Sequence, residues 1–226
     1  MNLEQDKVLY ANIIRVLQRQ STIILENHDQ GIMIYDTISQ AFMLATKTRE
    51  LAIEWLLKYE HMHYHLLVVY DQGLATYIKE HYHLQDCLVC YQAVYCDNDP
   101  FVFKHHLDMK QATQHDLATV YKYYCRLSKE ELIEIIDRGN LYLAYHDGYL
   151  VGFIGEHLEG SIGLLEVFKP YRHHGFDSEL EKRMINVMLK KGVLPYCQVE
   201  IDNEASLSLQ KKLGLSISHD KVYWLF

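Results

Sequence analysis

A glycine-containing turn between an apolar strand and an amphipathic helix carries the clearest chemistry in the chain, in FKPYRHHGFDSELEKRMINVMLKKG, residues 168–192. The turn centres on Gly175, and three residues that can donate hydrogen bonds come directly before it: Arg172, His173 and His174. A strand that turns through glycine into a helix N-terminus presents unpaired backbone N–H groups and a positive dipole, which together bind phosphate. Asp177 opposes this use, because a carboxylate repels phosphate. The residues therefore indicate an anion-binding turn with one unfavourable charge.

Two residues compete for the N-cap of the helix that follows. Asp177 is a common N-cap residue, and Ser178 forms a capping-box pattern with Glu181. If Ser178 is the N-cap, Asp177 lies outside the helix and can point to solvent. The sequence leaves both caps open and predicts a helix over residues 178–191, which Gly192 ends.

Glutamates on predicted strands are the candidates for moving a proton. In SIGLLEVF, residues 161–168, strand alternation places Glu166 on one face with Ile162, Leu164 and Phe168. A carboxylate among apolar neighbours is a stronger base than one in water. Glu166 is therefore the first candidate for a general base, and the alternative is a strand-edge residue that only reaches water. Glu200 is its rival, and Glu156 follows.

Cysteines and histidines offer a second chemistry, which is metal binding. Two cysteines in CLVC, residues 87–90, have metal-ligand spacing, but no second pair completes four ligands. The histidines alternate in EHMHYHL, residues 60–66, and in EHYHL, residues 80–84, which leaves a zinc site as an alternative. We interpret the cysteines as structural and the histidines as solvated, so no metal is expected.

The composition argues against several classes of protein. The chain has 226 residues, of which 49% are hydrophobic, enough for one large domain or two small ones. A net charge of −8 argues against a nucleic-acid partner, because phosphate backbones bind basic surfaces. The N-terminus has no signal-peptide pattern, and no stretch approaches the about 18 apolar residues of a membrane span. With five scattered cysteines, these features predict a cytoplasmic protein that does not enter the membrane.

Residues 101–226 predict a mixed α/β domain that positions these groups. A strand and two helices come first, in residues 105–139. An Asp-Gly turn at residues 147–148 then joins two apolar runs, which is a strong hairpin signal. The remaining elements are strands at 161–168, 195–201 and 215–226, and helices at 178–191 and 203–214.

Residues 1–100 repeat part of this order of strands and helices. Three strands within residues 21–46 precede a helix, and a strand, a second helix and the strand CLVCYQAVYC follow. The third strand leads into TKTREL, residues 46–51, which contains no glycine. The sequence therefore predicts two domains, 1–100 and 101–226, of which only the second keeps an anion-binding turn.

The order of elements, together with VFKPYRHHGFDSEL and NEASLSLQKKLGL, resembles the Gcn5-related N-acetyltransferases (GNAT). The signature of that family, (Gln/Arg)-x-x-Gly-x-(Gly/Ala), corresponds to Arg172 through Asp177, so Asp177 replaces a small residue. The resemblance covers the region from residue 102 onwards. A degenerate half before a complete one is similar to the tandem arrangement of glycine N-acyltransferases.

The resemblance implies an α/β GNAT fold that binds acetyl-CoA and uses no metal. In this family the pyrophosphate binds at the turn, and the pantetheine arm lies along the strand before it. The residues implied in cofactor binding are Val167, Phe168, Arg172, His173, His174, Gly175, Phe176, Asp177, Ser178 and Asn203.

The resemblance also implies direct transfer of an acetyl group to a primary amine of a small molecule or a peptide. Glu166 is then the base that takes the amine proton. The usual acid of the family, a tyrosine seven residues after Asn203, is replaced by Gln210, which leaves Tyr196 and Tyr223 as candidates. The alternative is an inactive GNAT-fold protein that binds CoA as a sensor or serves as an interaction module. The closing YWLF leaves a monomer and a homodimer open.

Overall fold

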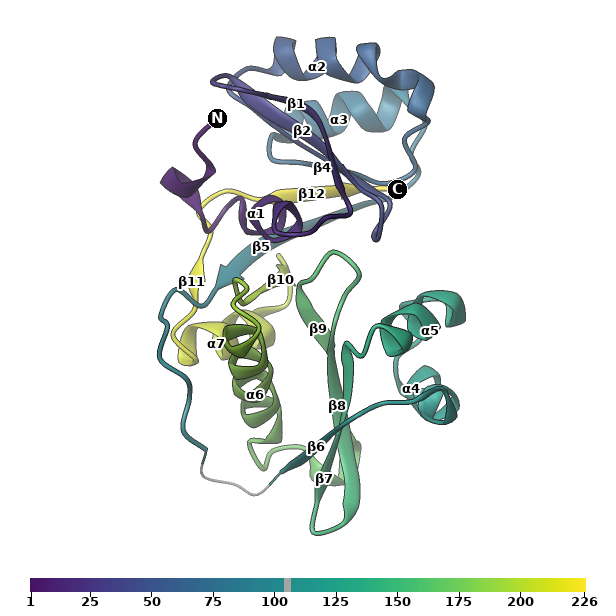
Figure 1. Ribbon diagram of the computed structural model, residues 1–226, viewed down its shortest axis with the longest axis vertical. Coiled ribbons are helices and arrows are strands. Elements are labelled where there is room, and N and C mark those ends of the chain that lie inside the picture. Colours follow the sequence, from purple (N-terminus) through teal and green to yellow (C-terminus); the bar gives the residue numbers. More distant parts are fainter. Residues whose placement is uncertain (104–106) are drawn as a thin grey trace. The chain divides into compact units, whose positions relative to one another are not determined.

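A computed structural model describes residues 1–103 and 107–226. The chain forms two units (Figure 1): unit 1 combines Met1–Val94 with Gln198–Phe226, and unit 2 is Tyr95–Cys197. The break after Val94 lies close to the domain boundary predicted at residue 100. The second break has no counterpart in the predicted domains, because Gln198–Phe226 groups with the N-terminal residues.

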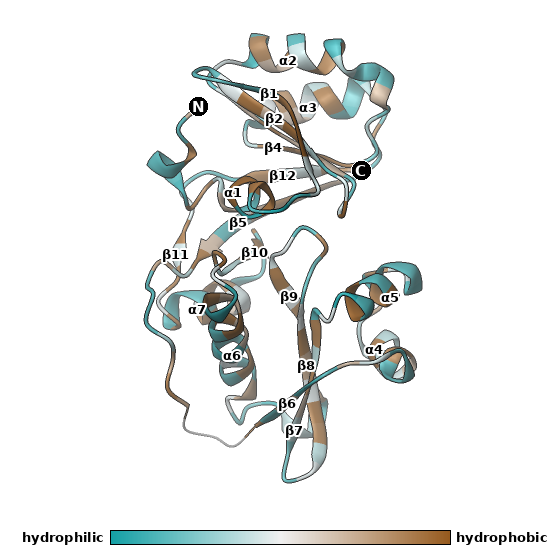
Figure 2. Cartoon of the chain, in the orientation of Figure 1, coloured by the Kyte–Doolittle hydropathy of each residue, from teal (hydrophilic) through white to brown (hydrophobic). Residues whose placement is uncertain are grey.

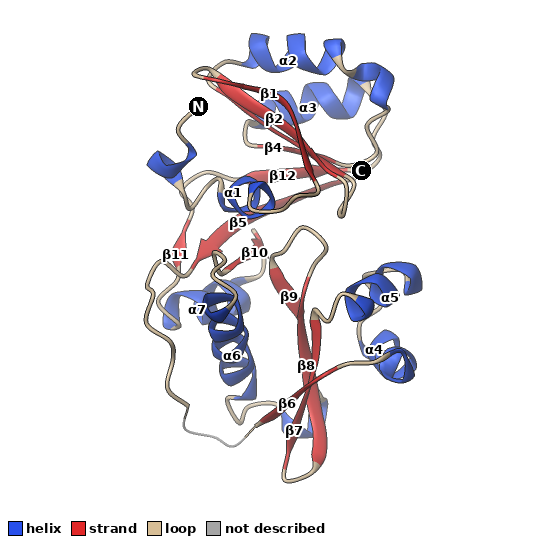
Figure 3. Cartoon of the chain, in the orientation of Figure 1, coloured by secondary structure: helices blue, strands red, loops and turns tan. Residues whose placement is uncertain are grey.

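Unit 1 contains a mixed sheet with helices on both faces. Its strands are β1 (Thr22–His28), β2 (Gly31–Asp36), β3 (Ala41–Thr46), β4 (Leu67–Val69), β5 (Cys87–Val94), β11 (Ser216–Ile217) and β12 (Val222–Leu225). Its helices are η1 (Leu3–Asp6), α1 (Ala11–Leu17), α2 (Arg49–Lys58), η2 (Glu60–Met62), α3 (Gln72–His81) and α7 (Glu204–Lys212) (Figure 3). The strands and helices predicted between residues 21 and 96 all form, whereas helix α1 was not predicted.

Strand β12 lies inside the sheet of unit 1. The strand order is β1-β2-β3-β4-β12-β5, and β11 also pairs with β5. Strand β12 is antiparallel to both neighbours, since Tyr223 lies opposite Val69 of β4 and Val89 of β5. The closing residues, predicted as one or two strands of the C-terminal domain, therefore form two strands of unit 1.

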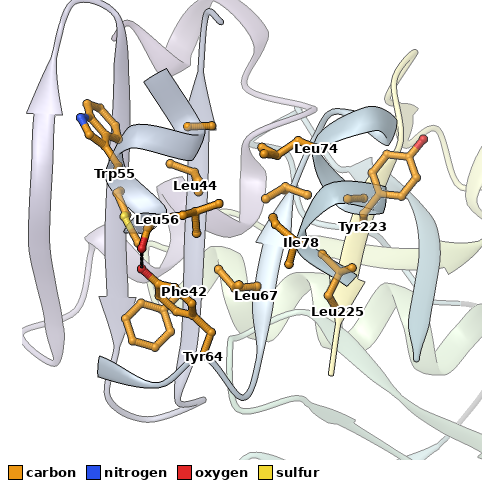
Figure 4. Packing of buried hydrophobic residues seen from close by; sticks show 14 residues of the cluster. Phe42, Leu44, Trp55, Leu56, Tyr64, Leu67, Leu74, Ile78, Tyr223 and Leu225 are labelled. Carbon is orange, nitrogen blue, oxygen red and sulfur yellow. Dashed lines mark hydrogen bonds between the residues drawn. The ribbon is translucent and has the colours of Figure 1, made fainter. Parts of the chain in front are cut away.

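Alternation along these strands gives unit 1 one apolar core on each face of its sheet. On one face, Leu67 and Leu225 pack with helices α2 and α3 (Figure 4). On the other face, their sequence neighbours Val68 and Trp224 pack with helix α1. Because successive side chains of a strand point to opposite faces, β12 contributes to both cores at once.

Unit 2 is built on strands in the order β10-β9-β8-β7-β6. These strands are β6 (Asp108–Gln111), β7 (Leu141–His146), β8 (Tyr149–Glu156), β9 (Ile162–Val167) and β10 (Tyr196–Glu200), of which β10 continues into unit 1. The helices are η3 (Gln114–Asp116), α4 (Leu117–Tyr123), α5 (Lys129–Asp137), η4 (Lys169–Tyr171) and α6 (Phe176–Lys190). Strands β9 and β10 are parallel, with Ile162 opposite Cys197, and the other neighbours are antiparallel.

The hairpin of β7 and β8 has the turn that its sequence predicts. Asp147 and Gly148 have φ angles of 50° and 80°. Two left-handed residues in a two-residue loop are typical of a type I′ turn. The strand and two helices predicted in residues 105–139 form as β6, α4 and α5, although residues 105 and 106 lie outside the described residues.

Two sets of helices cover the strands of unit 2. Helices α4 and α5 share an apolar core with β7, β8 and β9, which includes Val120, Ile135, Phe153 and Leu164. Helix α6 lies against β8 and β9, and its residues Leu180, Met184 and Met188 are fully buried. In Figure 2, α6 carries both brown apolar and teal polar segments, as an amphipathic helix does.

Candidate functional site

Helix α6 begins two residues earlier than the sequence predicts, at Phe176 instead of Ser178. Its N-cap is Gly175, at a φ of 81°. Both predicted N-caps are therefore wrong: Asp177 and Ser178 lie in the first turn, and no side chain of the described residues caps this helix. Because a left-handed φ favours glycine, the backbone of Gly175 sets the helix start without help from a capping side chain.

The start of α6 can bind an anion through its backbone. The first intrahelical bond runs from Glu179 N–H to the Gly175 carbonyl at 3.0 Å, so the amides of Phe176, Asp177 and Ser178 have no acceptor within the helix. The dipole of this 15-residue helix adds partial positive charge at the same end. A Cβ added to Gly175 would meet no atom within 4 Å, which means that the turn is open on that side. These features fit a phosphate, but the exposed carboxylate of Asp177 does not.

Two side chains of the turn, those of Arg172 and His174, form hydrogen bonds with neighbouring residues. Arg172 Nε donates to the Val167 carbonyl at 2.9 Å, and its second terminal nitrogen donates to Glu166 Oε1 at 2.8 Å. His174 Nδ1 lies 2.9 Å from the Arg172 carbonyl. His173 is exposed and has a φ of 65°, which is uncommon for a residue with a side chain. Arg172 and His174 thus hold the turn itself, in addition to any role at a phosphate.

A histidine that sequence reasoning missed lies at the start of α6. The ring of His146, at the end of β7, is centred 5.0 Å from the ring of Phe176, and the ring of His174 is centred 5.9 Å from it. Phe176 is buried, so the two histidines flank an apolar anchor of the helix. The predicted hairpin turn fixed the end of β7 at His146, but no sequence signal linked that strand end to α6.

A β-bulge interrupts β9 before Glu166. Phe153 of β8 lies opposite Glu166, and Gly155 lies opposite Gly163, so two steps along β8 correspond to three steps along β9. Leu164, within this interval, has a φ of 49°. The strict alternation predicted along β9 therefore does not hold through its middle.

Glu166 lies in a more polar setting than the predicted alternation implies. Its side chain is 21% exposed and pairs with the guanidinium of Arg172. It lies opposite Phe153, which shares the apolar core of α4 and α5 with Leu164 and Phe168, so Glu166 shares a face with these two residues as predicted. Ile162 lies opposite Glu156 and falls on the other face. Glu166 is thus a carboxylate that reaches solvent beside a cation.

Some backbone N–H and C=O groups at the end of β9 already form hydrogen bonds within the protein. Phe168 N–H donates to the Val151 carbonyl at 2.9 Å, and the Phe168 carbonyl accepts from Tyr171 N–H at 2.8 Å. In an antiparallel ladder, the first bond directs the backbone groups of the preceding residue, Val167, away from β8. Of the two residues predicted to hold a pantetheine arm, only Val167 therefore has its backbone groups turned outward, and its carbonyl already accepts from Arg172.

The rival glutamates occupy other places. Glu156 is buried, and Lys191 Nζ donates to its Oε1 at 2.6 Å, which ties the end of α6 to the end of β8. Glu200 lies on the part of β10 that belongs to unit 1. Of the three candidate glutamates, Glu166 is therefore the one beside the turn.

The candidate acid Tyr196 lies at the opposite end of β9 from Glu166. Its neighbour Cys197 pairs with Ile162, the first residue of β9, and four residues of strand, or about 13 Å, separate Ile162 from Glu166. Tyr196 is fully buried, and its hydroxyl donates to the Glu159 carbonyl at 3.4 Å. The structure does not bring Tyr196 and Glu166 together.

Two further candidates, Asn203 and Tyr223, belong to unit 1, as does Gln210 at the position of the usual acid. Asn203 caps α7 as predicted, since its side chain accepts from Ser206 N–H at 3.1 Å. Tyr223 is 8% exposed within the core of Figure 4, and burial raises the pKa of its hydroxyl. Gln210 is 2% exposed, and its Oε1 has no hydrogen-bond partner among the described residues.

Among residues 1–103 and 107–226, no three His, Cys, Asp or Glu side chains are arranged to hold a metal ion. No helix in the described part of the chain has both the length and the apolar character needed to cross a membrane.

A sequence profile of the Acetyltransferase (GNAT) family matches residues 104–215. This region is therefore similar to the GNAT family. Two curated N-alpha-acetyltransferases are also similar to the chain. MAK3 of Arabidopsis thaliana is 38% identical over 81 residues, which cover 32% of this chain and 43% of that protein. N-alpha-acetyltransferase 30 of Schizosaccharomyces pombe is 27% identical over 125 residues, which cover 51% of this chain and 80% of that protein.

Solved structures are similar to this chain over nearly its whole length. A Drosophila protein has a TM-score of 0.69 at 15% identity and covers 99% of this chain and 84% of its own. A GNAT acetyltransferase from Colwellia psychrerythraea has a TM-score of 0.53 at 13% identity and covers 91% of this chain and 85% of its own. At such low identity these likenesses show the fold alone.

The predicted GNAT fold with a mixed α/β sheet is thus confirmed. The family match and the two curated relatives also support the predicted class of enzyme, an N-acetyltransferase. The derivation of the N-terminal half from a second GNAT domain stays a prediction.

Proposed function

We propose that this protein transfers the acetyl group of acetyl-CoA to a primary amine at the turn between β9 and α6. The observation that carries the proposal is the left-handed Gly175 at the N-terminus of α6, inside the region that matches the GNAT family. The backbone amides of Phe176, Asp177 and Ser178 would bind the pyrophosphate. The outward backbone of Val167 would bind the pantetheine arm.

Glu166 is the proposed base of this reaction. Acetyl-CoA supplies an acetyl thioester. As the amine nitrogen bonds to the acetyl carbon, the carbon–sulfur bond breaks, the amine proton passes to Glu166 and the thiolate takes up a proton. Because Glu166 is 21% exposed, it can return its proton to solvent after each cycle.

The two candidate acids for protonation of the thiolate, Tyr196 and Tyr223, are less well supported by the structure than Glu166 is as the base. Tyr196 lies at the far end of β9 with its hydroxyl on the Glu159 carbonyl. Burial raises the pKa of Tyr223, which makes that hydroxyl a less ready proton donor at neutral pH. We therefore propose that thiolate protonation does not depend on Tyr196.

The α-amine of a peptide is the proposed acceptor, and a small-molecule amine is the alternative. Both curated relatives are named N-alpha-acetyltransferases. The chain spans 43% of the length of the Arabidopsis relative, so its acceptor does not follow from that likeness alone. A net charge of −8 suits an acceptor that approaches as a cation.

Calorimetric titration with acetyl-CoA near neutral pH tests the proposal, with desulfo-CoA and pyrophosphate as controls. We expect micromolar binding of acetyl-CoA, similar binding of desulfo-CoA and weaker binding of pyrophosphate alone. Peptides with free amino termini are then incubated with protein and acetyl-CoA, and a gain of one acetyl group is sought by mass spectrometry. Absence of binding at millimolar acetyl-CoA would refute the proposal.

A CoA-binding protein without transferase activity is the second candidate. Two departures from the family favour it: Asp177 at the start of α6, and Gln210 at the position of the usual acid. Micromolar binding of acetyl-CoA without acetylation of any peptide, amino acid or polyamine would support this candidate over the enzyme.

A further inference from the structure

Arg172 joins the turn to β9 at two consecutive residues. Its Nε donates to the backbone carbonyl of Val167 at 2.9 Å, and a terminal nitrogen donates to Glu166 Oε1 at 2.8 Å. The guanidinium is planar, so its donors keep a fixed angle to one another. The backbone bond to Val167 therefore determines where the second donor holds the Glu166 carboxylate.

The bond from Arg172 to Oε1 leaves the second carboxylate oxygen of Glu166 to accept a proton. Arg172 occupies Oε1, whereas Oε2 has no hydrogen bond to any of the described residues. A general base needs one oxygen aimed at the proton it accepts, and a fixed second oxygen limits rotation of the group. The Arg172 side chain thus holds Glu166 as a base requires.

The helix start provides its own groups for a phosphate. The backbone amides of Asp177 and Ser178 have no acceptor within the helix, whereas the guanidinium of Arg172 is turned back along β9. The side chains of Arg172 and Glu166 are 52% and 21% exposed, and ion pairs this close to solvent stabilise a fold little. Phosphate binding and stability therefore explain the pair less well than positioning does.

We propose that Arg172 is a positioning residue that holds Glu166 in place for the transfer reaction, and not a ligand of the cofactor phosphates. The inference rests on the proposed function. It departs from the sequence resemblance, which implied that Arg172 binds the pyrophosphate.

Four variants of the full chain test the inference: Arg172→Gln, Arg172→Lys, Glu166→Gln, and the double variant of Arg172→Gln with Glu166→Gln. The matched control is Arg138→Gln, because Arg138 also pairs with a glutamate, Glu134 of α5, at side-chain exposures of 39% and 46%. Each protein is titrated with CoA by calorimetry. The turnover number is then measured with saturating acetyl-CoA and a mixture of peptides that differ in their first residue.

We expect Arg172→Gln to lower kcat by about tenfold or more, to the level of Glu166→Gln, because both changes disable one general base. The double variant should lose no more than either single variant, since residues that act as a unit are not additive. Arg172→Lys should recover part of the loss. The Kd for CoA should stay within about threefold of the natural value in all variants, and Arg138→Gln should change neither quantity.

Two outcomes would overturn the inference while leaving the proposed function intact. One is a weakening of CoA binding by about tenfold or more in Arg172→Gln with kcat unchanged, as expected for a phosphate ligand. The other is independent, multiplying losses in the double variant. If the natural chain itself binds no CoA or transfers no acetyl group, the proposed function fails first, and the inference falls with it.

Discussion

Gly175 has a backbone conformation that an L side chain tolerates poorly. Its φ is 81°, and a Cβ there would meet no atom within 4 Å, so Gly175→Ala tests the backbone angle without a clash. We expect a loss of about 1 kcal/mol in the free energy of unfolding, because a left-handed alanine is strained. We also expect weaker CoA binding, because relief of the strain moves the first amides of α6.

Gly148→Ala is the matched control for this prediction. Gly148 has a φ of 80° and equally open surroundings, but it lies in the turn between β7 and β8. Urea denaturation should give similar losses for both variants, whereas calorimetry should show weaker CoA binding for Gly175→Ala alone. Equal CoA affinities in the two variants would separate the turn at Gly175 from cofactor binding.

Asp177 lies in the first turn of α6, where its charge helps the helix and hinders a phosphate. Asp177→Asn should lower the free energy of unfolding by about 0.3–1 kcal/mol, because a carboxylate near a helix N-terminus is favourable. The same change should tighten CoA binding by removing like-charge repulsion. Glu50→Gln in the first turn of α2 is the control, and it should lower stability without a change in affinity. Unchanged affinity in Asp177→Asn would mean that its carboxylate stays clear of the bound phosphates.

At the scale of the elements, β8 holds β9 at an approach that only glycine allows. A Cβ on Gly152 would lie 2.2 Å from the carbonyl oxygen of Glu166 and 3.1 Å from the Cα of Val167. Gly152→Ala must therefore displace β9 where both proposed functional residues lie, at an expected loss of about 1–3 kcal/mol in stability. We expect lower kcat and weaker CoA binding together, and near-natural values in Gly148→Ala. Normal kinetics in Gly152→Ala would show that the site tolerates a shift of β9.

Helix α3 has a cap that depends on pH. Asp71 accepts from Leu74 N–H at 2.6 Å and pairs with Arg49, and the bond to Arg49 is the main reason that the pKa of Asp71 is lowered. A carboxyl group with a lowered pKa stabilises the fold above its ordinary pKa and loses that contribution as the pH falls through the lowered one. Asp71→Asn keeps the cap but removes the ion pair. Its urea midpoint should therefore be slightly below the natural one at neutral pH. The difference should shrink as the pH falls below the ordinary aspartate pKa and should close below the lowered pKa of Asp71.

Glu4→Gln controls for a general effect of acid, since Glu4 is an exposed residue of η1. The urea midpoint of Glu4→Gln should equal that of the natural protein both at neutral pH and in acid. A difference between Asp71→Asn and the natural protein that persists in acid would assign the loss to the cap instead of the charge.

Signals that act over a few residues made most elements predictable. The Asp-Gly turn of the β7–β8 hairpin and the Asn203 cap of α7 are of this kind, and both form. The start of α6 was predicted wrongly because Asp177 and Ser178 are both common N-cap residues. The prediction gave their side chains more weight than the ability of Gly175 to adopt a left-handed φ. The bulge at Leu164 carries no marking residue type, and the pairing of Glu166 with Arg172 depends on the fold of the turn, which alternation along β9 does not predict.

At the scale of the whole molecule, the place of β12 could not be read from local sequence, because it depends on pairing between distant segments. A fragment of residues 1–96 would lack the strand between β4 and β5. We expect this fragment to remain unfolded by circular dichroism, because both apolar cores of unit 1 lose residues of β12. A synthetic peptide of residues 215–226 should restore its structure in trans.

The control peptide has Trp224→Asp and Leu225→Asp, one change on each face of the strand. It should not restore structure, because a buried carboxylate is costly. A fragment 1–96 that folds without any peptide would show that β12 is dispensable to unit 1.

Strand β12 also determines which unit can finish folding first while the chain is being translated. A ribosome adds about 5–20 residues per second, so the span from residue 95 to residue 225 takes roughly 7–26 s to translate. Throughout this time the first half is complete in sequence, but the edges of β4 and β5 await a partner. Unit 2 is continuous from Tyr95 to Cys197 and has all its residues sooner. The half that is synthesised first is therefore the half that finishes folding last, and its open strand edges are where a chaperone would be needed.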